Sequence, residues 1–257
     1  MSAPRRTIAA LAAAALLLAA ADTGLAAHAE HGFAGRLGED VALPGEPWVG
    51  LGGAAYASSL VTGRWSSIKV RARDVAVPGL GLVTVESGAV NARVPASAVF
   101  TGDFERTATK KFFTSVQLDA VALGGLLGVD DLLIQNLEDI SPAGGWETEA
   151  ILRATPPGAA GPATVAVKLR IRDGVVLLLP YEVIDAPAGA AASATLDAFR
   201  LTLGPGRLPL GGRPTRIYVS GGSIHVESER LHTTVTPADF LPLADAGRGD
   251  GAPAPGR

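Results

Sequence analysis

The sequence predicts an α+β fold in which a curled, strongly twisted antiparallel β-sheet wraps around short helices. Three observations lead to this class. Several segments alternate apolar and polar residues with a period of two, which is the pattern of half-buried strands. Tight-turn signals containing glycine, rather than long helices, join consecutive segments, which argues against a doubly wound parallel sheet. Finally, 47% of the residues are apolar but only 5% are aromatic, so the core is aliphatic.

The stretch SIKVRARDVAV, Ser67–Val77, shows the alternation most clearly. In an extended chain three apolar side chains point to one side (Ile68, Val70 and Ala72) and three cations point to the other (Lys69, Arg71 and Arg73). The apolar row resumes one residue out of step after Asp74. One side therefore suits a core or an acyl chain, and the other suits water or an anionic group.

We expect eight to ten strands and two or three short helices in all. Asp173-Gly174 and Gly221-Gly222 are the turns of two hairpins, over residues 164–180 and 216–235. Further strands are expected at 39–48, where prolines interrupt the chain, and at 81–94 and 110–118. Short helices are expected at 54–61 and 119–128, the second with Asp119 as N-cap and Gly128 as stop, and a capped turn at 236–239.

The N-terminus indicates export. Two arginines precede an apolar run from Ile8 to Ala21, which as a helix spans ~21 Å and is shorter than a ~30 Å bilayer core. Ala27-His28-Ala29 has the small-x-small form of a signal-peptidase site. We interpret residues 1–29 as a cleaved secretion signal, with an uncleaved anchor as the alternative. A single domain over residues 36–243 and a disordered Gly/Pro-rich tail over 244–257 follow, placing the protein in the periplasm or cell envelope, peripheral to the plasma membrane.

Composition and motifs exclude several functions. The chain has no cysteine, hence no disulfide or thiolate nucleophile, and its net charge of −3 argues against nucleic acid as a partner. His225, Glu227 and Glu229 share one strand face, which we interpret as solvated rather than as a metal site. No nucleophile elbow or phosphate loop occurs. We expect a monomeric, non-enzymatic protein without a cofactor or metal.

A binding function remains. A sheet wrapped around small helices can leave an apolar groove for acyl chains, with cations at its mouth for a phosphate. Two alternatives stay open: an envelope structural or interaction protein whose core is filled, and a glycolipid hydrolase if His225 and the acids converge in space.

Several motifs resemble an actinobacterial family of exported phospholipid-binding proteins, the LmeA-like family. They are Gly45-Glu46-Pro47-Trp48, Gly63-Arg64-Trp65, the strand Ile68–Val75, and the two hairpins named above. The resemblance extends over most of residues 37–235. It departs from the family pattern at Trp48, where Phe is usual, and in the longer, Gly-rich stretch 48–63.

The resemblance implies a fold related to tubular lipid-binding (BPI/TULIP-like) domains and an apolar cavity for a phospholipid, most of all an anionic glycerophospholipid. It also implies a role in envelope lipid or glycolipid maintenance, at the membrane surface and beside a glycolipid-synthesis enzyme. On this interpretation Lys69, Arg71 and Arg73 face the head group or the membrane. Nine apolar residues are expected along the acyl chains: Trp48, Leu51, Tyr56, Leu60, Trp65, Phe112, Val165, Val167 and Leu169.

Overall fold

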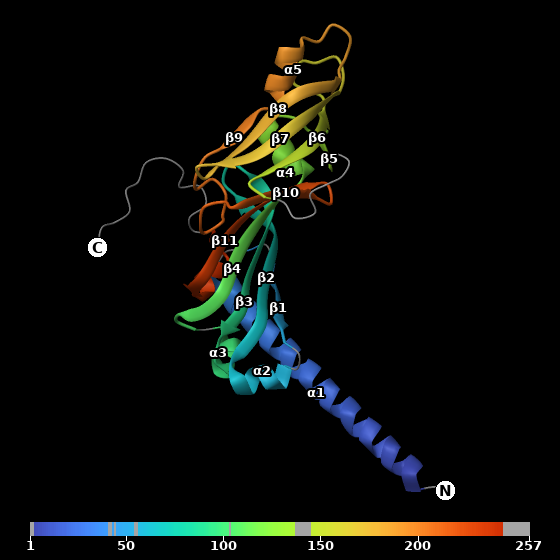
Figure 1. Ribbon diagram of the computed structural model, residues 1–257, viewed down its shortest axis with the longest axis vertical. Coiled ribbons are helices and arrows are strands. Elements are labelled where there is room, and N and C mark those ends of the chain that lie inside the picture. The colour runs from blue at the N-terminus through green and yellow to red at the C-terminus, as the bar shows by residue number, and fades with distance from the viewer. Residues whose placement is uncertain are drawn as a thin grey trace, which may run out of the picture.

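The computed structural model of the chain describes residues 3–40, 43, 45–53, 56–102, 104–136 and 145–243. It confirms the α+β class, with two antiparallel sheets that follow one another along the long axis of the molecule (Figure 1). The sequence predicted one sheet, so the second is a correction. The expected tail over 244–257 lies outside the described residues.

The first sheet has six strands in the order β1-β2-β3-β4-β11-β10. Their bounds are β1 Trp48–Gly52, β2 Arg64–Val77, β3 Gly81–Arg93, β4 Thr107–Leu118, β10 Arg216–Ser220 and β11 Ser223–Val235. In β2 the predicted alternation is confirmed, since Ile68, Val70 and Ala72 are buried. Asp74 has a left-handed φ of 54°, and the bulge between Ala72 and Val75 returns Val75 and Val77 to the buried side.

The second sheet has five strands in the order β5-β6-β7-β8-β9. These are β5 Leu133–Asn136, β6 Glu147–Ala154, β7 Ala163–Arg172, β8 Val175–Asp185 and β9 Leu201–Leu203. Asp173 and Gly174 both have positive φ, 52° and 81°, as the predicted tight turn between β7 and β8 requires. The two sheets meet where the amide of Ile217 in β10 donates to the carbonyl of Gly145, 2.7 Å away and just before β6.

Eleven strands and six helical segments are present among the described residues, more than the expected eight to ten and two or three. The helices are α1 Ala3–Asp40, α2 Tyr56–Thr62, α3 Ala96–Thr101, α4 Ala120–Leu127, α5 Ala192–Ala198 and the 3-10 turn η1 Pro237–Phe240. Asp119 caps α4 as predicted, because its Oδ1 accepts a hydrogen bond from the Ala122 amide at 2.8 Å. The capping box at Thr236 and Asp239 is also confirmed.

The expected strand at 39–48 is corrected at both of its ends, since Glu39 and Asp40 are the last residues of the long helix α1 and the first strand begins at Trp48. The C-terminal half of α1 packs on the six-stranded sheet through buried Ala29, Phe33, Ala34 and Leu37. Ala29, the expected end of the leader, and residue 36, the expected start of the domain, both lie within this helix. No helix within the described ranges is both long and apolar enough to cross a membrane.

Polar contacts also fix α1. The Asp22 carboxylate accepts hydrogen bonds from the backbone amides of Tyr56 and Ala57, at 3.1 and 2.6 Å, and so caps the start of α2. Glu30 Oε1 accepts a hydrogen bond from the Leu51 amide of β1 at 2.8 Å. Upstream of Asp22 the helix projects away from the rest of the molecule (Figure 1), with Leu16 and Leu17 more than 70% exposed.

Candidate functional site

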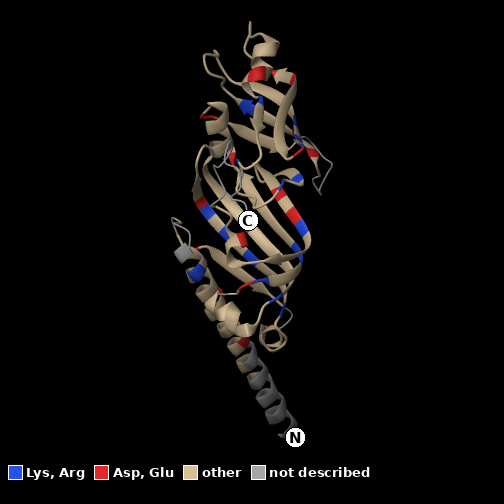
Figure 2. Ribbon diagram, turned by 90° about the vertical axis from the view of Figure 1, so that its left-hand side faces the viewer, with Lys and Arg blue, Asp and Glu red and all other residues tan. Residues whose placement is uncertain are grey.

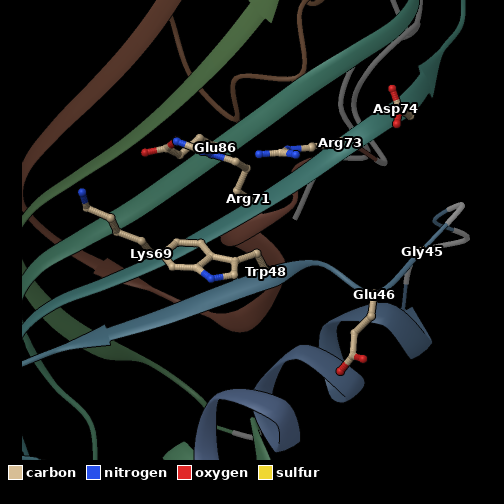
Figure 3. Close-up of a pocket in the computed structure, with 8 residues that line it drawn as sticks. All are labelled: Gly45, Glu46, Trp48, Lys69, Arg71, Arg73, Asp74 and Glu86. Carbon is tan, nitrogen blue, oxygen red and sulfur yellow. The ribbon is translucent and has the colours of Figure 1, made fainter. Parts of the chain in front are cut away.

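The three cations predicted for the head group line an open cavity of about 570 Å³ on the six-stranded sheet. Trp48 of β1 and Glu86 of β3 lie directly opposite Arg71 in the two neighbouring strands. Figure 3 shows Lys69, Arg71 and Arg73 on the same side of β2 as Trp48 and Glu86. Gly45, Glu46 and Asp74 complete the lining. This arrangement, called the Trp48 site below, joins an aromatic side chain to a row of positive charge.

The three cations are not equivalent. Arg71 is bound to Glu86, with its Nε donating to Oε2 at 2.8 Å and its Nη2 contacting the same oxygen. Lys69 and Arg73 are exposed and make no ion pair with any described residue. Because only an unpaired cation keeps its full charge for a ligand, Lys69 and Arg73 are the residues available to an anion.

Trp48 is 57% exposed, although it was expected to line an acyl chain. Its ring covers Gly50, since a Cβ at Gly50 would lie 2.4 Å from Cη2 of Trp48. Gly50 in turn lies opposite Lys69 in the strand register. Only glycine therefore leaves room for the indole to lie along the sheet beside the lysine. An exposed tryptophan next to cations is typical of groups that meet a lipid interface.

The other expected acyl-chain residues are divided among three places. Tyr56 and Trp65 pack edge to face, with ring centroids 5.0 Å apart, and Leu51 and Leu60 lie half-buried against the same core. Phe112 is buried against Phe240, and Val165, Val167 and Leu169 are fully buried in the five-stranded sheet. The structure thus separates these residues, and their contact with lipid stays a prediction.

Tyr56 and Trp65 are held firmly in place. Trp65 Nε1 donates to the Val94 carbonyl at 3.0 Å. Burial, and secondly the nearby carboxylates of Glu30 and Asp22, raise the pKa of Tyr56 to about 12, so the phenol stays neutral. The Tyr56 hydroxyl is buried without a hydrogen-bond partner among the described residues.

The face that carries His225, Glu227 and Glu229 is used by contacts within the sheet. The His225 ring stacks on Tyr218 with centroids 4.8 Å apart, and burial lowers its pKa. Glu227 lies 3.5 Å from Arg216, and Glu229 is paired with Lys111. Burial raises the pKa of Glu227, against the opposing effect of Arg216. No cluster of three or more metal-ligating side chains occurs in the described part of the chain.

A smaller cavity of about 240 Å³ adjoins this face and shares Arg71 and Glu86 with the Trp48 site. The sequence interpretation missed Glu86 and Tyr218, which line this cavity. Cations and carboxylates lie side by side across the long strands of this sheet (Figure 2). Only the register between strands, and not the spacing along one strand, brings Glu86 beside Arg71.

Comparison with known protein families identifies the family of this chain. The model of the LmeA-like phospholipid-binding family matches residues 20–229, which is most of the chain. The protein belongs to the LmeA-like phospholipid-binding family. The resemblance predicted from its motifs is confirmed, and the family is one of lipid-binding proteins rather than of enzymes. The match includes the sheet-packed half of α1, all of the five-stranded sheet, and the six-stranded sheet as far as residue 229 in β11. Searches of curated proteins and of solved structures gave no significant match.

Proposed function

We propose that this LmeA-like protein binds an anionic glycerophospholipid at the Trp48 site and does not act as an enzyme. The proposal rests on one observation: an open cavity holds the exposed indole of Trp48 together with Lys69 and Arg73, two cations that form no ion pair with any described residue. The phosphate lies between the cations, and the glycerol and first methylenes lie on the indole. Arg71, held by Glu86, fixes the shape of the site and contributes less charge.

The acyl chains extend from Trp48 toward Leu51 of β1 and Leu60 of α2, which keep part of their surface exposed and border the interior. Deeper entry requires Tyr56 and Trp65 to move, since both are at most 5% exposed. In this proposal the protein is an exported, peripheral monomer that carries or presents phospholipid for envelope lipid and glycolipid maintenance, beside an enzyme of glycolipid synthesis.

The packed interior favours a second candidate function. Trp65, Phe112, Val165 and Val167 are at most 2% exposed, which is the state expected of a filled core. An envelope interaction protein that binds a partner with its sheet surface and holds no lipid would have this interior.

Replacing both Lys69 and Arg73 with alanine is expected to weaken binding to anionic vesicles by about ten- to thirtyfold at low salt. Each cation contributes ~1 kcal/mol at an anionic surface, and 1.4 kcal/mol corresponds to tenfold. The salt dependence should also become shallower. The measurement is co-sedimentation with vesicles of phosphatidylglycerol and phosphatidylcholine over a range of salt concentrations.

The matched control is Arg172→Ala with Arg200→Ala, which removes the same charge from exposed positions on the five-stranded half, where each arginine lies near an exposed aspartate. Binding should be unchanged in this variant. Equal binding by the Lys69/Arg73 variant and the wild type would remove the assignment of the head group to the Trp48 site.

Export gives a separate prediction about the leader. The contacts of Asp22 support cleavage before Asp22 rather than after Ala29, because cleavage after Ala29 would remove the cap of α2. Ala19-Ala20-Ala21 offers the same small-x-small pattern. We expect N-terminal sequencing of the exported protein to begin at Asp22. A start at Glu30 would contradict this prediction.

A further inference from the structure

A second open cavity, of about 730 Å³, lies toward the end of the long strands where α2 precedes β2. It shares no lining residue with the Trp48 site. Three neighbouring strands each contribute one cation to it, Arg64 from β2, Arg93 from β3 and Lys110 from β4, and His232 of β11 adds an imidazole. No carboxylate lines it. We call it the Arg64 groove.

In the Arg64 groove two like charges lie opposite one another on neighbouring strands, whereas Arg71 and Arg170 face charges of opposite sign. Arg64 and Arg93 are directly opposite one another in the β2–β3 register. Like charges in that position destabilise a sheet. Elsewhere Arg71 lies opposite Glu86, and Arg170 lies opposite Glu147 with Nε 2.8 Å from Oε2. Within the described ranges, neither Arg64, Arg93 nor Lys110 makes an ion pair.

The backbone of β3 and β11 is irregular beside these cations. Asn91 and His232 have left-handed φ values of 53° and 48°, and regular pairing is interrupted at both. In β3 the buried side chains lie at odd-numbered positions, such as Val85 and Ala89, but the next buried side chain is Ala92. This change reverses the alternation, so Arg93 faces outward. Such backbone conformations are energetically unfavourable in non-glycine residues and cluster at ligand sites.

Neighbouring side chains hold this bend. The hydroxyl of Thr109 donates to the Val90 carbonyl at 2.8 Å, and that of Thr107 donates to the Arg93 carbonyl at 2.9 Å. Both threonines are only 4% exposed. The irregular stretch is therefore a fixed part of the groove.

We propose that the Arg64 groove binds a phosphate group, with the guanidinium groups of Arg64 and Arg93 on its oxygens and Lys110 beside it. Two arginines on directly opposite positions of neighbouring strands can present both guanidinium groups to the several oxygens of a phosphate, and their mutual repulsion is relieved when it binds. The phosphate belongs to a lipid head group or to a soluble phosphate compound. This site is independent of the proposed function of the Trp48 site, because it consists of different residues.

The test uses the full chain and the double variant Arg64→Gln/Arg93→Gln. Two probes are compared: sodium pyrophosphate by titration calorimetry, and vesicles of phosphatidic acid in phosphatidylcholine by co-sedimentation. We expect the variant to lose about tenfold or more in affinity for at least one probe. The Arg172/Arg200 variant removes the same charge outside both proposed sites and should keep the wild-type affinity for both probes.

The pattern of losses identifies the source of the phosphate. Loss for pyrophosphate together with unchanged vesicle binding indicates a soluble phosphate compound, and loss for phosphatidic acid vesicles indicates a lipid head group. No wild-type binding to either probe, or equal binding by wild type and variant, would overturn the proposal.

Unfolding provides an independent measurement. In low-salt buffer without phosphate, the Gln variant should unfold at an equal or higher temperature than the wild type, because the repulsion between two arginines is gone. Pyrophosphate should raise the unfolding temperature of the wild type alone. A variant that is less stable than the wild type in phosphate-free buffer would mean that the arginines are structural, which contradicts the proposal.

Discussion

Replacing Phe240 with alanine is expected to lower the free energy of unfolding by about 3–5 kcal/mol. Phe240 is fully buried, and its ring centroid lies 5.9 Å from that of Phe33, 6.4 Å from Phe104 and 5.3 Å from Phe112. It therefore joins η1 to α1 and β4 as well as to Phe104. Urea denaturation followed by circular dichroism measures the effect.

Leu82→Ala is the control for this variant, because Leu82 is 56% exposed at the start of β3. Its free energy of unfolding should change by less than about 1 kcal/mol. A loss of similar size in the two variants would contradict the aromatic packing between α1 and the sheet.

Alanine at Gly32 and alanine at Gly35 are expected to change stability in opposite directions. A Cβ at Gly32 would lie 2.3 Å from the carbonyl oxygen of Phe100, so α1 and α3 would have to separate. We expect a loss of about 1–3 kcal/mol from this overpacking, in spite of the better helix propensity of alanine. At Gly35 nothing lies within 4 Å of the added Cβ, so alanine should stabilise by about 0.8–1 kcal/mol.

Both variants add one methyl group to the same helix, and they differ only in the atoms that the methyl group contacts. Their unfolding midpoints in urea provide the comparison. Stabilisation by both substitutions would show that α1 does not pack closely on α3 at Gly32, which contradicts the contact with Phe100.

The hairpins could be predicted from the sequence because their signals are local. Asp173-Gly174 fixes a turn by its own backbone preference, and the residues of β7 alternate on either side of the sheet without regard to distant contacts. The helix over residues 22–40 was missed, although Ala29, Phe33 and Leu37 recur at helical spacing. The apolar run and the small-x-small pattern at residue 29 favoured a leader, and only packing against the distant Phe240 reveals the helix.

The candidate sites depend on register, which spacing along one strand does not determine. Counting back from the pair of Val77 with Gly81 would place Ser87 opposite Arg71. The bulge between Ala72 and Val75 shifts the pairing by one residue and brings Glu86 there instead. The same shifted register places Arg93 opposite Arg64, so the spacing along one strand does not reveal the Arg64 groove either. The sequence could not show that Trp48 is exposed, because a five-residue strand with glycines at 50 and 52 has no clear alternation of apolar and polar residues.

The measurement that tests the central claim most directly is native mass spectrometry of the protein purified without detergent, followed by solvent extraction and lipid analysis. We predict a mass increased by one phospholipid and an extract in which an anionic glycerophospholipid predominates. The bare mass of the chain, together with no uptake of lipid from anionic vesicles, would contradict lipid binding by this protein and favour the envelope interaction protein with a filled core.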